Sequence, residues 1–261
     1  MKIGVPIGHR YEPVEVGQIK SIAAKISAKY HMTARWTGWA DFGEFEMSNI
    51  CARRIASAAK FYGTDFGVEA ALYLDGKTAS HALFEALSNS AGLMHNDPGN
   101  IMRGMDTYKM LKNVENPGIY KCSTAVFYPI EGEQCGIIGD MEQFYREIAI
   151  LRRSFDYEIA DSLMIADGFL ENIDTLIFAG KMPVLSETCD IIMRYVKERG
   201  LKLLCMSCDM PYVIDAKEER FLDCDLVGKE ILENEVACYR TEFSDRTLVF
   251  DAEKGSISEI R

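Results

Sequence analysis

Apolar residues recur along this chain in short strand-like runs, each followed by a polar loop and then by a segment with helical spacing. The clearest unit begins at residues 64–72, an apolar run that carries one carboxylate, Glu69, in its interior. A helical pattern follows over 78–91, then a short apolar run at 92–94 and a polar cluster at 95–100. Strands and helices that alternate in this way predict βαβ units with a parallel sheet.

The first half of the chain contains four such units. The predicted strands are 2–7, 34–40, 66–72 and 92–94, and the predicted helices are 16–30, 49–61, 78–91 and 106–113. The apolar positions Ile19, Ile22, Ala23 and Ile26 predict a buried face on the first helix. Ser48 is expected to N-cap the second helix and Gly63 to end it. Four consecutive βα units correspond to half of an eight-stranded (β/α) barrel.

The pattern changes after a turn signal at 116–118. Strands are predicted at 123–129, 175–180 and 201–206, helices at 140–153 and 186–199, and tail strands at 236–239 and 247–250. Alternating strands and helices here indicate a small doubly wound parallel sheet. The predicted fold class is therefore α/β: a half (β/α) barrel over 1–116, followed by a flavodoxin-like doubly wound domain over 117–261.

Composition and charge narrow the partner classes. The chain is 48% hydrophobic and 26% charged, as in ordinary globular proteins. Its net charge of −11 argues against a nucleic-acid partner, because binding to phosphates requires Lys and Arg side chains. No apolar run is long enough to span a membrane, and no signal-peptide pattern opens the chain, so we expect a cytoplasmic protein without membrane contact.

The eight cysteines are interpreted as free thiols, because most lie in apolar runs of a chain that lacks an export signal. Cys205 and Cys208 alone have CxxC spacing. No second CxxC and no nearby histidine accompanies them, so a zinc or redox site is not favoured. The sequence predicts no metal and no cofactor.

Four segments carry a resemblance to a known family: residues 155–159, 167–168, 176–180 and 195–200. In this order they resemble the amidotransferase-like domain that follows the catalytic barrel in β-galactosidases of glycoside hydrolase family 42 and its relatives. In that family the seventh barrel strand ends at the nucleophilic Glu, and Glu69 stands at the matching place here.

The chain also departs from the family pattern in one respect. The family carries its acid/base Glu, usually after Asn, at the end of strand four, whereas this chain begins at what would be strand five. The only Asn-Glu pair, Asn234-Glu235, falls in the C-terminal tail, where it cannot take that role.

Glu69 is the candidate nucleophile, because a retaining glycosidase needs two carboxyl groups about 5–5.5 Å apart, one of them a nucleophile. The alternative is a core Glu paired with Arg35 on the neighbouring strand. Six residues near predicted strand ends are candidates for binding the substrate: His9, Arg10, Trp39, Asp41, His95 and Asn96. A plain turn at 97–100 is the alternative for the last two, and barrel packing explains Trp36 as well as function does.

Two other enzyme classes fit poorly. A class I glutamine amidotransferase needs a histidine downstream of its cysteine, and no histidine follows His95. A flavin or nucleotide module needs a phosphate-binding loop, but the loop at 129–133 is acidic.

The expected function is that of a glycoside hydrolase-like protein that acts on or binds β-galactosides or related glycosides, incomplete as a catalyst in this chain. The alternative is a non-catalytic carbohydrate-binding or oligomerisation module that retains a glycosidase scaffold. Open sheet edges predict a homo-oligomer, or a partner segment that supplies the rest of the barrel.

Overall fold

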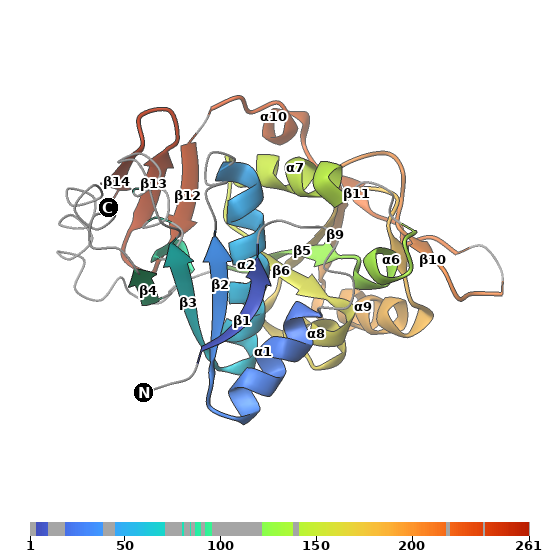
Figure 1. Ribbon diagram of the computed structural model, residues 1–261. Helices are drawn as coiled ribbons and strands as arrows, with labels where there is room; N and C mark the ends of the chain where they lie inside the picture. Colours follow the sequence, from blue (N-terminus) through green and yellow to red (C-terminus); the bar gives the residue numbers. More distant parts are fainter. Residues whose placement is uncertain are drawn as a thin grey trace.

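The computed structural model describes residues 4–9, 19–38, 45–70, 80, 84, 87–89, 92–95, 122–137, 141–217, 220–236 and 238–260. At 4–9, 37–38, 45–48, 68–70, 92–95 and 141–143 it describes the backbone alone. Two parallel sheets are joined by helices, and a small antiparallel sheet lies beside the first of them (Figure 1).

The first sheet contains the four strands predicted for the first half of the chain. All neighbours are parallel and lie in chain order: β1 (Gly4–His9), β2 (Thr33–Gly38), β3 (Asp65–Ala70) and β4 (Gly92–His95). Burial along β2 alternates, since Ala34 and Trp36 are buried in the core while Thr33 and Arg35 are half-buried. This period of two is that of a strand with one face packed against helices.

Helices α1 (Lys20–Lys29) and α2 (Phe45–Tyr62) pack on this sheet. Gly63 ends α2 with a positive φ of 73°, as predicted. Ser48, however, lies inside α2 and not at its N-cap, because the helix begins three residues earlier, at Phe45. Of the helix predicted at 78–91, the described residues 80, 84, 87 and 88 are helical, whereas the helix predicted at 106–113 lies outside the described residues.

Helix α1 is packed in part differently from its prediction. Its buried residues are the small ones, Ser21, Ala24 and Ser27, whereas Ile22 and Ile26 are exposed. Helix α1 contacts α2, β1 and β2. The expectation of a buried face was wrong for Ile22 and Ile26, whereas Ile19 and Ala23 of that face pack against the core.

The second sheet has five parallel strands in the order β11-β9-β7-β5-β6. They are β5 (Thr124–Tyr128), β6 (Glu158–Asp161), β7 (Thr175–Phe178), β9 (Lys202–Cys205) and β11 (Asp225–Leu226). The first strand in the chain, β5, pairs with β6 at one edge of the sheet. The later strands β7, β9 and β11 then follow in chain order on the other side of β5. The α/β class predicted for this half is confirmed, and β6 and β11 are additions to the predicted strands.

Helices connect these strands: α6 (Ile130–Gln134), α7 (Met141–Leu151), α8 (Ser162–Ala166), a 3-10 turn (Phe169–Asn172) and α9 (Ser186–Arg199). Helix α7 buries Phe144, Ile148 and Leu151, the face predicted from their spacing. Helix α9 matches its predicted bounds and ends at Gly200, whose φ of 70° suits glycine.

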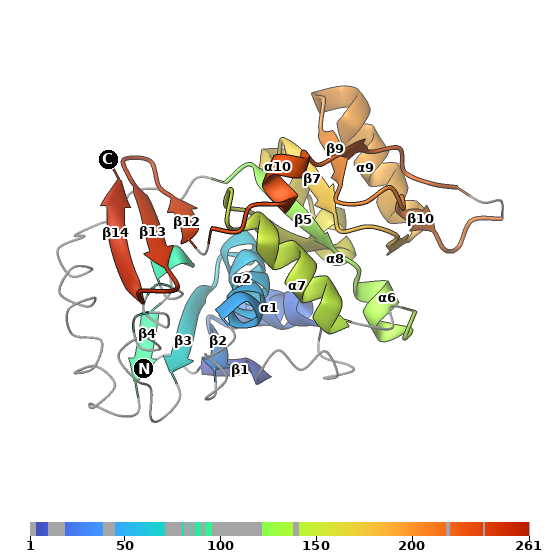
Figure 2. The same ribbon diagram turned by 90° about the horizontal axis from the view of Figure 1, so that it is seen from above.

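Helix α2 lies between the two sheets, as the view from above shows (Figure 2). It contacts β2 and β3 on one side and β6 and α7 on the other. Every residue from 49 to 59 is buried, and one continuous apolar cluster includes members from both halves of the chain. The predicted boundary at 116/117 lies outside the described residues, but the two halves share a core.

The remaining strands form two small sheets. Parallel β8 (Pro183–Val184) and β10 (Tyr212–Val213) flank the second sheet, and α10 (Lys229–Leu232) precedes the tail. The predicted tail strands belong to a three-stranded antiparallel sheet of β12 (Cys238–Glu242), β13 (Thr247–Asp251) and β14 (Ser256–Ile260). Phe84, from the segment after β3, stacks on Phe250 of this sheet with ring centroids 5.2 Å apart.

Candidate functional site

The backbone register brings three of the predicted site residues to one edge of the first sheet. His9 pairs with Thr37, Thr37 with Glu69, and Glu69 with Met94, so these residues form a row across all four strands. The next pair, Ala70 and His95, lies one residue further along. His9, Glu69 and His95 are thus at the carboxyl ends of their strands, where parallel α/β folds carry their sites.

The other predicted site residues, Arg10, Trp39, Asp41 and Asn96, lie outside the described residues, and the side chains of His9, Glu69 and His95 do as well. The expected grouping of these residues around Glu69 stays a prediction. Arg35, the alternative partner for Glu69, pairs with Gly67, two residues before Glu69 on β3.

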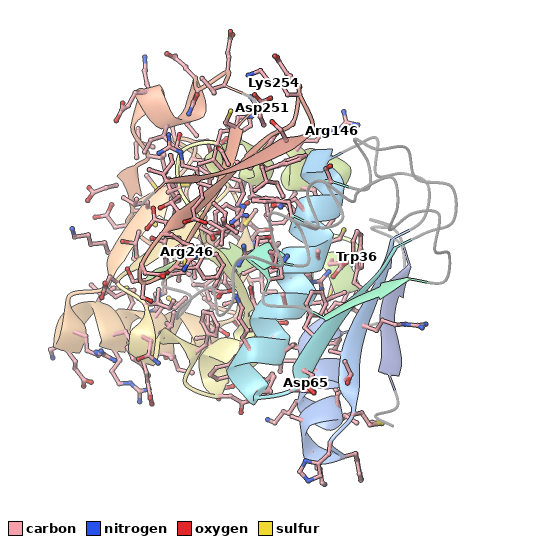
Figure 3. All side chains as sticks on the ribbon, turned by 90° about the vertical axis from the view of Figure 1, so that its left-hand side faces the viewer. Trp36, Asp65, Arg146, Arg246, Asp251 and Lys254 are labelled. Carbon is pink, nitrogen blue, oxygen red and sulfur yellow. The ribbon has the colours of Figure 1, made fainter. Side chains whose placement is uncertain are left out.

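Figure 3 shows Trp36 and Asp65 on the first sheet, with Asp65 at the far end of β3 from the strand tips. Trp36 is buried in the core that the sheet shares with α2, which favours packing over function, the two roles that the sequence left open for it. Asp65 is exposed and lies at the amino end of β3, away from the candidate site.

A second polar cluster, which sequence reasoning missed, lies where α2 meets the second sheet. Helix α2 presents four polar side chains toward that sheet: Arg53, Arg54, Ser57 and Lys60. Two adjacent arginines in a helix otherwise rich in alanine and serine were the available signal. Alanine and serine side chains are too small and too apolar for a typical solvent-facing helix surface, so they indicate a buried helix. Charged side chains on a buried helix need partners inside the protein.

Arg54 joins α2 to the carboxyl end of β5. Its guanidinium lies over the ring of Tyr128 at 3.5 Å from the centroid, a cation-π contact. It also donates to the Tyr145 hydroxyl at 3.3 Å and to a Glu133 carboxylate oxygen at 3.1 Å. Burial alone would lower the pKa of Arg54, but attraction to these three groups outweighs burial and raises it. Arg54 is therefore held as a buried cation.

Asp156 joins two further arginines just before β6. Its carboxylate lies 3.2 Å from Arg53 Nη2 and forms an ion pair with Arg152, and all three side chains are almost fully buried. Arg152 also donates to the Thr241 hydroxyl of β12 at 3.4 Å. One carboxylate thus fixes α2, the end of α7 and the C-terminal sheet relative to one another.

Glu158, at the start of β6, forms the third part of the cluster. It lies 2.5 Å from Lys60 Nζ and accepts a hydrogen bond from the Ser57 hydroxyl, which itself accepts from the Ile159 amide at 3.0 Å. Burial lowers the pKa of Lys60 to about 8, and Glu158 offsets this only in part. Burial alone would raise the pKa of Glu158, but Lys60 and Arg53 lower it overall.

The carboxyl ends of β5 and β6 are acidic and paired. Asp161 accepts from the Ser21 hydroxyl of α1 at 2.6 Å and caps α8 by accepting from the Met164 amide at 3.0 Å. Ser162 donates to Glu131, whose pKa is raised by burial. The segment predicted as an acidic loop at 129–133 is instead mostly helix α6, but its carboxylates still make this end of the sheet unfavourable for phosphate.

The cysteines are all free, as predicted. Cys51, Cys189, Cys205 and Cys224 are buried, while Cys135 and Cys208 are exposed. Burial raises the pKa of Cys205, the first cysteine of the CxxC segment, which disfavours the reactive thiolate that a redox motif needs. These thiols add no catalytic group to the site.

Among the described residues, no three His, Cys, Asp or Glu side chains gather closely enough to hold a metal ion. Nor does any helix in the described ranges have both the length and the apolar character needed to cross a bilayer. Comparison of the chain with family models, curated proteins and solved structures gave no match.

Proposed function

We propose that the first sheet carries a carbohydrate site in which Glu69 is the nucleophile of a glycoside hydrolase-like protein. The observation that carries the proposal is the parallel register, which aligns His9, Glu69 and His95 at the carboxyl ends of adjacent strands. β-Galactosides or related glycosides are the proposed ligands, as the family resemblance implies. The half-barrel interpretation of β1–β4 belongs to this proposal.

The second half supports the same assignment at the level of topology. Numbered within its own sheet, the strand order β6-β5-β7-β9-β11 is 2-1-3-4-5, the order of flavodoxin-like doubly wound sheets. A domain of this type follows the barrel in the family that the sequence resembles. We assign it a structural role, because the described carboxylates at its strand ends pair with groups of the chain itself.

Glu69 alone cannot complete hydrolysis of an ordinary glycoside. The leaving group requires a proton from a second carboxyl about 5–5.5 Å from the nucleophile. The resemblance assigns that acid/base Glu to a strand that would pair with the edge of β1 that has no strand neighbour among the described residues. We therefore expect the chain to turn over glycosides only weakly unless a partner segment or a second copy completes the site.

A substrate with a good leaving group separates the nucleophile from the missing acid. With 2,4-dinitrophenyl β-galactoside, Glu69 would bond to the anomeric carbon while dinitrophenolate departs without a proton. We expect a burst of about one equivalent of dinitrophenolate and a galactosyl group on Glu69 by peptide mass spectrometry. The Glu69→Gln variant should lose the burst, and Asp65→Asn, a carboxylate at the other end of β3, should retain it.

The alternative is a non-catalytic carbohydrate-binding or oligomerisation module on a glycosidase scaffold. The exposed apolar residues of α1 favour it, because they offer a surface for another chain. Binding of methyl β-galactoside by calorimetry, with no burst and no labelled Glu69, would select this alternative. If calorimetry shows no binding and mass spectrometry shows no label on Glu69, both carbohydrate functions are contradicted.

A further inference from the structure

The first sheet has one face against α2 and an opposite face that carries a cation. Ala34 and Trp36 of β2 and Phe66 of β3 are buried in the core that the sheet shares with α2 (Figure 3). Because side chains alternate along a strand, Arg35 of β2 and Gly67 of β3 belong to the opposite face. Arg35 is half-buried, so its side chain is partly enclosed on that face of the sheet.

The neighbours of Arg35 in its row across the sheet are small. The register pairs Arg35 with Pro6 of β1 on one side and with Gly67 of β3 on the other, and Gly67 pairs with Gly92 of β4. A glycine has no side chain to pack against the strand beside it. The two glycines therefore leave room for a long side chain from β2 to extend over β3.

The next row on the same face, toward the carboxyl ends of the strands, contains Glu69. Glu69 follows Gly67 by two residues, so its Cα is the diagonal neighbour of the Arg35 Cα, at about 8 Å for ordinary strand spacing and rise. Such diagonal neighbours are within reach of a long side chain. Asp65 is the other diagonal neighbour, but it is exposed at the amino end of β3, where an ion pair contributes little.

A carboxylate nucleophile has two requirements that an arginine can meet. It must be ionised, and its plane must be fixed so that one oxygen faces the anomeric carbon. A guanidinium is always charged, and its rigid fork donates charge-assisted hydrogen bonds to a carboxylate. An ionised carboxylate has about four lone-pair positions, so one remains available for the attack when two accept from an arginine.

We propose that Arg35 is the positioning residue for Glu69 and holds its carboxylate in the orientation from which it attacks the anomeric carbon. The inference rests on the proposed function, because it takes Glu69 as the nucleophile. A pair between these two residues is also the structural alternative to catalysis, in which it would add stability alone. The two roles differ in what the loss of Arg35 does to the reaction.

The test measures the burst of dinitrophenolate that the full chain releases from 2,4-dinitrophenyl β-galactoside. Arg35→Ala should slow the burst about a hundredfold at saturating substrate, the cost of a misplaced reacting group, with the half-saturating concentration unchanged. Guanidinium chloride at about 50 mM, far below denaturing concentrations, should restore much of the rate of Arg35→Ala, and sodium chloride should not. Arg35→Lys keeps the charge without the fork and should give an intermediate rate.

Two control variants should leave the burst rate unchanged. Asp65→Asn removes the other diagonal carboxylate, and Arg220→Ala removes an exposed arginine that pairs with Asp190 of α9. Circular dichroism shows which variants are folded.

Three outcomes would overturn the positioning role. The first is a native burst rate in folded Arg35→Ala, or in Arg35→Lys if the alanine variant does not fold; Glu69 then stays the nucleophile. The second is a slow burst that guanidinium does not restore and that Asp65→Asn shares, which indicates a general disturbance of the sheet. The third is the absence of any burst from the native chain, which contradicts the proposed function and this inference with it.

Discussion

Asp156 is the residue on which the buried charges most depend. Its carboxylate forms ion pairs with both Arg53 and Arg152, which are themselves fully buried. Removing one partner of a buried ion pair leaves an uncompensated charge away from water, at a cost of about 3–5 kcal/mol. The cluster therefore specifies how α2 sits on the second sheet, and any loss of it should appear directly in stability.

Asp156→Asn is expected to lower the free energy of unfolding by about 3–5 kcal/mol in urea denaturation. The control is Asp190→Asn, which removes the 2.9 Å ion pair with Arg220 between two exposed side chains. Exposed pairs contribute about 0–1 kcal/mol, so the control should be nearly neutral. Equal effects of the two changes would contradict the buried role of Asp156.

Lys60 should make stability depend on pH in the alkaline range. Its pKa falls from 10.5 to about 8 in the folded protein, so between these values the unfolded chain binds more protons. Stability then rises with pH, and Lys60 contributes on the order of 1–3 kcal/mol across that window. The unfolding free energy of the native protein minus that of Lys60→Met should therefore increase from pH 8 to pH 10.5. A constant difference would mean that Glu158 keeps Lys60 protonated.

At the scale of residues, sequence reasoning found positions better than it found partners. The strand-end placement of Glu69, His9 and His95 followed from periodicity alone, because period-two patterns and turn signals are local. The partners of Arg53 and Arg54 could not be predicted in this way, since Asp156 and Tyr128 lie far along the chain and meet these residues only after the second sheet has formed.

At the scale of elements, the C-terminal sheet packs against Phe84 of the segment after β3. Phe84 is fully buried against Phe250, and Tyr239, Phe243, Leu248 and Ile257 complete that small core. The turn between β13 and β14 is held by Asp251, which accepts from the Lys254 amide at 2.9 Å and pairs with its Nζ at 2.7 Å (Figure 3). The unit that carries Glu69 is thus connected to the end of the chain.

Phe250→Ala should destabilise the small core between Phe84 and the C-terminal sheet. Truncating a buried Phe costs about 3–5 kcal/mol, through lost burial and the cavity left behind. Because the small core is separate from the main one, we expect faster hydrogen exchange at β12–β14 and at residues 80, 84 and 87–89, with α9 unchanged. Uniformly faster exchange over the whole chain would show instead that the two cores unfold together.

The elements that were predicted correctly are those whose signals are local. Helix α9 has apolar spacing and a glycine stop, and β5 is a run of β-branched and aromatic residues. The two-residue strands β8, β10 and β11 carry too little pattern to be seen, because their pairing depends on the tertiary fold. Helix α1 was predicted as an element, but two of the four apolar residues on its predicted face, Ile22 and Ile26, are exposed, since periodicity shows a stripe and not which neighbour it meets.

At the scale of the whole molecule, the shared helix makes the two sheets one structural unit. A single apolar cluster includes residues of both sheets, and α2 supplies the residues between them. The sequence predicted two domains in order along the chain. It gave no sign of the shared core, because an alanine-rich helix buried on all sides resembles a weakly amphipathic one.

Both halves should therefore unfold in one transition. Trp36 fluorescence, recorded in a Trp39→Phe variant because the chain has two tryptophans, reports on the first sheet. Alkylation of the buried Cys205 thiol reports on the second. We expect the same urea midpoint from both probes, as two-state unfolding requires. Exposure of Cys205 at a clearly lower urea concentration than the change at Trp36 would show that the halves are independent.

The burial of α2 from two sides also has a consequence for synthesis. When the ribosome has produced α2, about 100 residues, or roughly 5–20 s of translation, separate it from β6, which carries Glu158 and follows Asp156. Until then Arg53 and Lys60 lack their carboxylates and must stay hydrated. The first half of the nascent chain should accordingly remain unfinished, open to chaperones, and settle only after the second half has emerged.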